Sequence, residues 1–183
     1  HLSIRRQRQM CIRDSNGEII PMAGGMPNHN QIALNIAGTL NFLLKRQPYR
    51  VFVTDQRLWI AQYRVYTYPD VMVVSGDLFL QEGRKDTITN PTLIIEVLSK
   101  STGSFDRDKK FNFYRSLPSF QEYLLVDQYR YSVQHYVKIS TKKWEFQEYD
   151  SLEEEIKFST VPGAITLTEI YDKVELETPE YGT

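Results

Sequence analysis

The fold is decided by residues 93–98, LIIEVL, in which five apolar residues surround a single carboxylate. Apolar residues on both faces are typical of a central strand that is covered on each side. Period-two alternation places Glu96 on the same face as Ile94 and Leu98, where an isolated charge is strongly disfavoured. The sequence therefore predicts that Glu96 has a cation, a metal ion or hydrogen-bond donors as partners.

A second carboxylate, Asp70, opens an apolar strand predicted over residues 70–74. It follows Pro69, whose fixed φ suits an extended entry into a strand. Mg²⁺ prefers a few carboxylate oxygens plus waters and can activate water against a phosphodiester. Asp70 and Glu96 are therefore candidate metal ligands. Spacing alone leaves another interpretation open, in which Glu96 forms a buried ion pair and Asp70 caps a turn.

A helix predicted over residues 106–116 carries the candidate third member of the site. Asp106, Lys110 and Tyr114 are four residues apart and share a helix face. Beside two carboxylates, the Lys110 ammonium would hold the attacking water or stabilise charge on a phosphate oxygen. The alternatives are an ordinary surface salt bridge between Asp106 and Lys110, and a core-facing rather than positioning role for Tyr114.

The order of the other predicted elements indicates an α/β or α+β fold, with a sheet packed against a helix. The clearest helix spans 30–46, before Pro48, and a helical turn is expected within 166–174. His135 lies in an alternating segment and is expected to be half-buried. Residues 16–183 contain no long linker or repeat, which predicts a single domain. Further strands are predicted at 18–20, 50–54, 58–62, 92–98, 123–126, 131–137 and 144–149.

Composition limits the classes of function. The chain has 183 residues, of which 41% are hydrophobic, so a core can form without a disulfide or structural metal. No run of about 18 apolar residues and no signal-peptide pattern occurs, so we expect a cytoplasmic protein without membrane contact. A formal net charge of -1 excludes a strongly basic nucleic-acid coat.

Residues 1–15, HLSIRRQRQMCIRDS, differ from the rest of the chain and show no helical or strand periodicity. Residues 10–15 can be encoded by the end sequence of a transposon used in sequencing libraries, so we interpret this segment as adapter read-through. The alternative is a basic disordered tail. Without its four Arg and one Asp, 18 basic and 22 acidic residues remain, a net charge of -4. Contact with DNA would then require a local basic patch and metal neutralisation of the acids.

Several motifs occur in a fixed order between residues 17 and 127. Gly17–Ile20, Met22–Gly24, His29 and Asp55 precede the main run. That run consists of Tyr68-Pro69-Asp70-Val71, then 95–102 (IEVLSKST), then Asp106-Arg107 with Lys110 and Tyr114, then Glu122-Tyr123 and Val126-Asp127. Together these motifs resemble the Uma-type restriction endonucleases, a family abundant in cyanobacteria that belongs to the PD-(D/E)XK nuclease superfamily.

The resemblance implies a restriction-endonuclease-like core, a mixed sheet flanked by helices with an additional antiparallel meander. It implies that Asp70 and Glu96 bind Mg²⁺, or Mn²⁺ in its place. The superfamily pattern E-x-K has a lysine where this chain has Leu98. In this family the lysine is on the following helix, and Lys110 occupies the matching position. Lys100 is the competing lysine, although it falls in a turn.

The same resemblance implies a supporting role for His29, which would contact a phosphate or a metal-bound water. The alternative is that His29 has a structural role in a turn or a helix cap. The implied activity is that of a Mg²⁺-dependent DNA endonuclease that hydrolyses phosphodiester bonds by direct attack of water. A homodimer is expected, so that each subunit cuts one strand. The alternative function is a catalytically inactive domain that keeps the fold and binds nucleic acid or protein.

Overall fold

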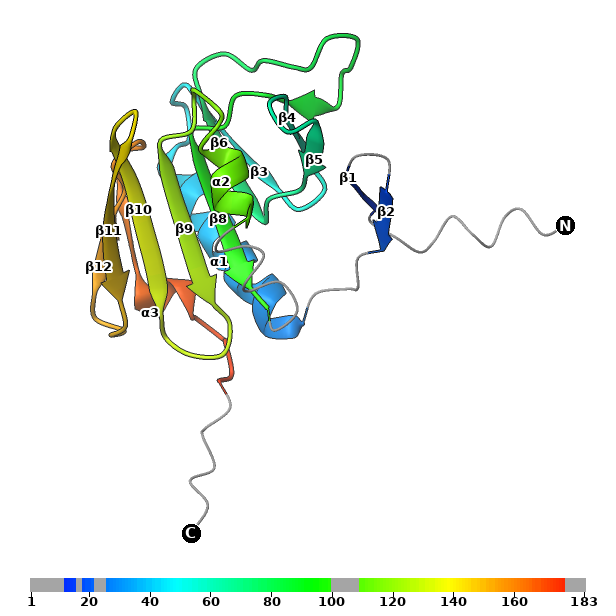
Figure 1. Ribbon diagram of the computed structural model, residues 1–183. Coiled ribbons are helices and arrows are strands. Elements are labelled where there is room, and N and C mark those ends of the chain that lie inside the picture. The colour runs from blue at the N-terminus through cyan, green and yellow to red at the C-terminus, as the bar shows by residue number, and fades with distance from the viewer. Residues whose placement is uncertain (1–11, 16–17, 22–25, 100–108, 177–183) are drawn as a thin grey trace, which may run out of the picture.

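The computed structural model describes residues 12–15, 18–21, 26–99 and 109–176. Its centre is a six-stranded sheet with the order β11-β10-β9-β8-β6-β3 (Figure 1). Strands β8 and β9 pair in parallel and the other neighbours pair antiparallel, which confirms the predicted mixed sheet with an antiparallel meander. The strands are β3 (Tyr49–Val53), β6 (Val71–Ser75), β8 (Leu93–Leu98), β9 (Glu122–Asp127), β10 (Val133–Ser140) and β11 (Lys143–Tyr149).

Two smaller sheets complete the β-structure. One has the order β2-β1-β5-β4-β7, and the other pairs β12 with β13. Their strands have four residues or fewer, too few for periodicity to reveal most of them. The predicted tail contains β1, and residues 1–11 of it lie outside the described residues. These strands are β1 (Ile12–Ser15), β2 (Glu18–Pro21), β4 (Arg57–Ile60), β5 (Val65–Thr67), β7 (Thr87–Ile88), β12 (Glu155–Lys157) and β13 (Ala164–Thr166).

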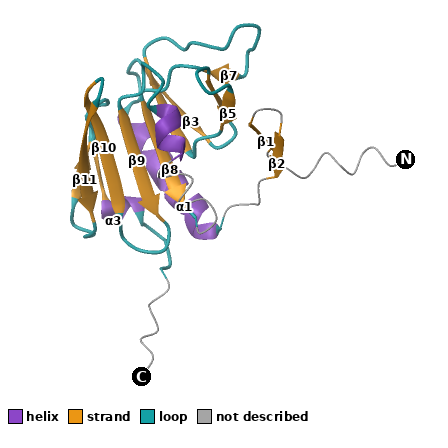
Figure 2. Ribbon diagram, in the orientation of Figure 1, coloured by secondary structure: helices purple, strands orange, loops and turns teal. Residues whose placement is uncertain are grey.

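Three helices are described: α1 (Pro27–Leu43), α2 (Phe111–Tyr114) and α3 (Leu167–Ile170) (Figure 2). Helix α1 begins three residues earlier than predicted because Pro27 suits the first helical turn, where an N–H is not required. It ends earlier because Arg46, at φ 62°, takes the left-handed conformation that terminates helices. Helix α3 confirms the predicted helical turn, with a capping box between Thr166 and Glu169. Among the described helices, none has the length and apolar character needed to cross a bilayer.

The main sheet separates two hydrophobic clusters. The cluster that contains α1 includes Ile95 and Val97, and the other contains Ile94, Leu98 and the α2 residue Tyr114. Every residue of β8 is buried. The alternation along this strand is therefore the predicted one, with Glu96 on the side of the sheet that faces α2.

Gly163, in the turn between β12 and β13, provides a test of how this hairpin packs on α1. Its φ is +110°, and a Cβ there would lie 2.8 Å from Cδ1 of Leu43. We expect Gly163→Ala to lower the free energy of unfolding by about 1–3 kcal/mol, because both the backbone conformation and the contact penalise a side chain.

The matched control is Gly38→Ala in α1, where an added Cβ would meet nothing within 4 Å. This change should raise the free energy of unfolding by about 0.5–1 kcal/mol, since alanine favours a helix interior. Urea unfolding measures both variants. A Gly163→Ala protein as stable as the wild type would contradict the described packing.

Candidate active site

Glu96 lies within β8 with a side chain that is only 2% exposed. The ammonium Nζ of Lys110 lies 2.8 Å from Oε2, and the Tyr114 hydroxyl donates to Oε1 at 2.6 Å. These contacts confirm the prediction that a carboxylate in this strand has a cation or donors as partners. The ion pair left open as an alternative is therefore present, and both carboxylate oxygens accept hydrogen bonds.

The segment around α2 presents both partners of Glu96 from one face. Lys110 belongs to a π-helical turn at 109–110 that continues into α2, and Tyr114 follows one turn later. The side chain of Lys110 is 1% exposed, so Lys110 is not a solvated surface lysine. Asp106, its expected partner in that alternative, and Lys100, the competing lysine, lie outside the described residues.

Tyr114 combines the two roles that the sequence offered as alternatives. Its ring packs in the core, with centroids 5.7 Å from those of Phe120 and Tyr123. Its hydroxyl reaches out of this apolar cluster to the Glu96 carboxylate. A buried tyrosine hydroxyl needs such a partner, so the core contact and the polar contact support each other.

Asp70 precedes β6 directly and is held next to Glu96. Its Oδ2 accepts the backbone N–H of Val97 at 2.8 Å and lies 3.3 Å from Nε2 of His29. Val71 pairs with Ile95, and the same antiparallel register continued by one residue places Asp70 opposite Glu96. Cross-strand neighbours in an antiparallel pair lie close together. The fold thus brings the two predicted carboxylates to adjacent positions.

His29 lies in the first turn of α1 rather than before the helix, and its imidazole contacts Asp70. Burial lowers the pKa of His29, but the hydrogen bond and charge of Asp70, with smaller contributions from Asn30 and Glu96, raise it above its ordinary value. For Asp70 the signs are reversed, because burial raises the pKa of an acid. His29, Lys110 and the Val97 N–H outweigh burial and leave the pKa of Asp70 below its ordinary value. These influences link His29, Asp70, Glu96 and Lys110 in one electrostatic cluster.

The donor atoms of this cluster fit a Mg²⁺ ion. Within the described part of the chain, no group of three or more His, Cys, Asp or Glu side chains is placed to hold a metal. Mg²⁺ does not require one, because it is usually held by one or two carboxylates and several waters. Oδ1 of Asp70 accepts no hydrogen bond from a described residue. Each oxygen of Glu96 has two lone pairs, so its bonds to Lys110 and Tyr114 do not exclude a metal.

A second buried acid, Glu122 at the start of β9, was not singled out as a polar site by sequence reasoning. The side chain is 0% exposed and accepts four hydrogen bonds, from His135 Nε2, the backbone N–H groups of Ser159 and Thr160, and the Thr160 hydroxyl. The prediction of a half-buried His135 is wrong, because its side chain is 5% exposed. A signal was available: a glutamate opens the apolar run EYLLV, as Glu96 interrupts LIIEVL.

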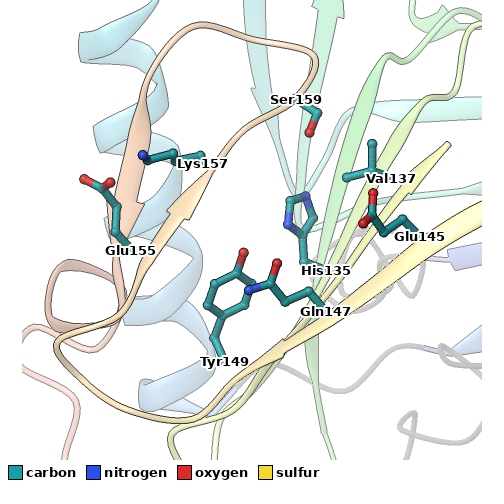
Figure 3. Close-up of a pocket in the computed structure, with 8 residues that line it drawn as sticks. All are labelled: His135, Val137, Glu145, Gln147, Tyr149, Glu155, Lys157 and Ser159. Carbon is teal, nitrogen blue, oxygen red and sulfur yellow. The ribbon is translucent and has the colours of Figure 1, made fainter. Parts of the chain in front are cut away.

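His135 also lines a pocket of about 350 Å³ between the β10–β11 pair and the β12 segment. Figure 3 shows its imidazole between Ser159 and Tyr149. In the pairing of β8 with β9, Glu122 lies opposite Leu93, which is three residues before Glu96. The two buried acids are therefore three residues apart along the strand direction. The hydrogen bonds of Glu122 attach the loop after β12 to the main sheet, which gives this acid a structural role.

Comparison of this structure with solved structures identifies the class of fold. The crystal structure of a putative nuclease belonging to DUF820 from Anabaena variabilis matches it with a TM-score of 0.68 and 18% sequence identity. The match covers 87% of this chain and 89% of that chain. The protein therefore has a nuclease-like α+β fold, with a mixed sheet flanked by helices.

The sequence identifies the family. Residues 2–169 match the Uma2 family, described as "Putative restriction endonuclease", and the chain belongs to this family. The uncharacterized protein sll1609 of Synechocystis sp. is 45% identical over 143 residues, which cover 78% of this chain and 81% of that protein. The uncharacterized protein slr1290 of the same organism is 34% identical, with coverages of 75% and 73%. The expected family membership is thereby confirmed.

The pairing of Glu96 with Lys110 predicts a strong coupling between the two residues in stability. Lys110→Met should lower the free energy of unfolding by about 3–5 kcal/mol, because it leaves a buried carboxylate without its cation. Adding Glu96→Gln should recover part of this loss, with a coupling energy of about 1–3 kcal/mol in a double-mutant cycle. Chemical denaturation of the four proteins measures the cycle, and strictly additive effects would contradict the pairing.

Glu122 predicts a pH-dependent contribution to stability. Burial raises its pKa, but hydrogen bonds from His135, Thr160 and Ser159 outweigh burial and leave the pKa below its ordinary value. A lowered folded-state pKa contributes stability above the unfolded-state pKa of about 4.3, and this contribution is lost as pH falls through the folded-state value. Glu122→Gln should therefore cost about 1–3 kcal/mol at neutral pH and progressively less below about pH 4.

The control for this measurement is Glu145→Gln, an exposed glutamate that lines the same pocket. It should match the wild type in denaturant unfolding at each pH. A difference between wild type and Glu122→Gln that stays constant from neutral to acid pH would show that ionised Glu122 is not the source of the effect.

Proposed function

We propose that the protein is a Mg²⁺-dependent DNA endonuclease that hydrolyses phosphodiester bonds by direct attack of water. The observation that carries this proposal is that Asp70 lies opposite Glu96 and that Lys110 donates to the Glu96 carboxylate. Membership of a family described as "Putative restriction endonuclease" supports the same class of reaction. Mn²⁺ is the expected substitute metal.

Asp70 and Glu96 would hold the ion, which supplies Lewis-acid stabilisation of the phosphate and lowers the pKa of a bound water. His29 and the Val97 N–H hold Oδ2 of Asp70 and thereby orient its other oxygen. Tyr114 fixes Oε1 of Glu96. Lys110 is placed to position the attacking water or to stabilise the charge that develops on the phosphate. Water forms a new P–O bond, one P–O ester bond breaks, and the leaving oxygen takes a proton.

A second candidate function is a nucleic-acid- or protein-binding domain without turnover. The observation that favours it is that each oxygen of Glu96 already accepts a hydrogen bond, one from Lys110 and one from Tyr114. In that case the acid is structural and the protein does not bind Mg²⁺ through it. Calorimetric titration with Mg²⁺ separates the two functions, because heat of binding that disappears in Glu96→Gln as well as in Asp70→Asn supports the endonuclease.

The expected homodimer belongs to the same proposal. Cleavage of both strands of a duplex by two identical subunits requires a two-fold arrangement of two sites. Sedimentation velocity of the protein with a short duplex measures the assembly that is present during cleavage.

Plasmid cleavage in Mg²⁺ or Mn²⁺ tests the proposed activity. Asp70→Asn and Glu96→Gln should each lower the cleavage rate by about a hundredfold or more, because each removes a carboxylate that would hold the metal ion. Lys110→Met should also lose activity. Asp172→Asn is the matched control, because Asp172 has a side chain that is 62% exposed and lies outside the site.

Thermal unfolding of each purified variant shows whether it is folded, so that loss of activity is not confused with loss of structure. Gel-resolved products from proteins of equal purity give the rates. Equal cleavage by the wild type and a folded Asp70→Asn protein would assign the activity to a contaminant and contradict the proposal.

A further inference from the structure

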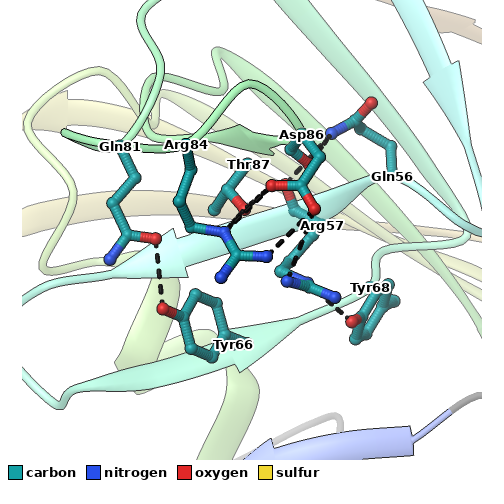
Figure 4. A network of polar contacts seen from close by, with 8 residues as sticks. All are labelled: Gln56, Arg57, Tyr66, Tyr68, Gln81, Arg84, Asp86 and Thr87. Atoms are coloured by element: carbon teal, nitrogen blue, oxygen red, sulfur yellow. Dashed lines mark hydrogen bonds and ion pairs between the residues drawn. The ribbon is translucent and has the colours of Figure 1, made fainter.

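Arg57, from the sheet that contains β4 and β5, lies near Arg84, from the loop before β7 (Figure 4). Arg57, from β4, places its guanidinium 5.4 Å from the centre of the Tyr66 ring and 5.7 Å from that of Tyr68. Its Nε donates to the Tyr68 hydroxyl at 2.8 Å. Contacts with two rings and a hydroxyl hold this guanidinium in one orientation, which lowers the entropic cost of binding an anion.

Arg84, in the loop before β7, is held beside Arg57 by Asp86. Its Nε and Nη2 donate to the two carboxylate oxygens at 2.9 and 3.0 Å, and its Nε also donates to the Thr87 hydroxyl. Asp86 Oδ2 lies 3.6 Å from Nη1 of Arg57. One carboxylate thus faces two guanidinium groups, and the cluster keeps a positive charge.

This cluster can accept an anion from solvent. The side chains of Arg57, Arg84 and Asp86 are 29%, 38% and 58% exposed. Among the described residues, no acceptor hydrogen-bonds to either Nη of Arg57 or to Nη1 of Arg84. Guanidinium groups match phosphate oxygens in geometry and charge, so these nitrogens offer donors of the type that phosphate binds.

The position of the cluster connects it with the candidate active site. Tyr68, which holds Arg57, is separated from Asp70 only by Pro69. Hydrogen bonds between Tyr66 and Gln81 and between Gln56 and the Asp86 backbone fix the surrounding loop to β4 and β5. A DNA strand that has one phosphate at the carboxylates and extends toward Tyr68 would meet this cluster.

We propose that Arg57 and Arg84, supported by Tyr66 and Tyr68, bind backbone phosphates of the DNA strand that enters the Asp70–Glu96 site. Asp86 keeps the two arginines ordered in the absence of DNA and is the group with which phosphate competes. This inference rests on the proposed endonuclease function. It supplies the local basic patch that a chain with more acidic than basic residues requires for contact with DNA.

Binding of a short fluorescein-labelled DNA duplex, measured by anisotropy across a range of salt concentrations, tests this assignment. Ca²⁺ replaces Mg²⁺ in the binding assay, and cleavage in Mg²⁺ is measured separately. Arg57→Gln and Arg84→Gln should each weaken binding about tenfold and reduce the steepness of the salt dependence by about 0.9, the value for one phosphate contact. Arg130→Gln is the control for charge, because Arg130 is an exposed arginine paired with Asp127 elsewhere.

Asp86→Asn should change DNA binding in the opposite direction, because it removes the carboxylate that competes with phosphate and keeps both arginines. It should tighten DNA binding about threefold or more relative to Asp172→Asn, which makes the same change of charge at a distant exposed position. Thermal unfolding confirms that each variant is folded.

Three results would overturn the inference. If the wild type cleaves DNA while the Arg57, Arg84 and Asp86 variants bind like their controls, the phosphate site is wrong and the endonuclease stands. If an acidic peptide such as polyglutamate competes as well as DNA of equal charge, the cluster is a general anion site. If the wild type neither binds nor cleaves DNA with any of these metals, the proposed function and the inference fail together.

Discussion

The structure depends on one buried ion pair. β8 is buried along its whole length, yet it carries Glu96, and the carboxylate is tolerated there because Lys110 and Tyr114 hold its two oxygens. An unpartnered charge at this position would be strongly disfavoured. The requirement for these partners places the segment 109–114 against one face of the sheet, while α1 covers the other.

The same constraint organises the candidate site. Asp70 is tied to β8 through the Val97 N–H and to α1 through His29, so that two carboxylates from neighbouring strands meet beside a lysine. Among the described residues, the lysine and the two arginines of this region differ in exposure. Lys110 is buried with the acids, whereas Arg57 in β4 and Arg84 in the loop before β7 reach solvent. This division suits a substrate whose reacting phosphate is desolvated and whose neighbouring phosphates remain at the surface.

The sequence predicted the features that depend on strong local patterns. An apolar run with one acid indicated that Glu96 is buried with partners, and spacing placed Lys110 and Tyr114 on one helix face. The assignment of Lys110 to the same site came from the resemblance to the family, because spacing alone also allowed a surface salt bridge. The Glu122–His135 contact was not identified, because it joins residues from different strands, and the other donors to Glu122 come from Ser159 and Thr160 in a loop far along the chain. Strands such as β5 and β7 were missed because two or three residues have no measurable periodicity. The Arg57–Asp86 cluster depends on the pairing of these strands and was equally invisible.

The central claim is that Asp70 and Glu96 bind one metal ion together. An anomalous difference map from a crystal soaked in Mn²⁺ tests it directly. We expect one peak between the two carboxylates, about 2.1 Å from an oxygen of each, which is the distance typical of Mg²⁺. A map without a peak at this position, with Glu96 bound only by Lys110 and Tyr114, would contradict the claim and leave the acid with a structural role.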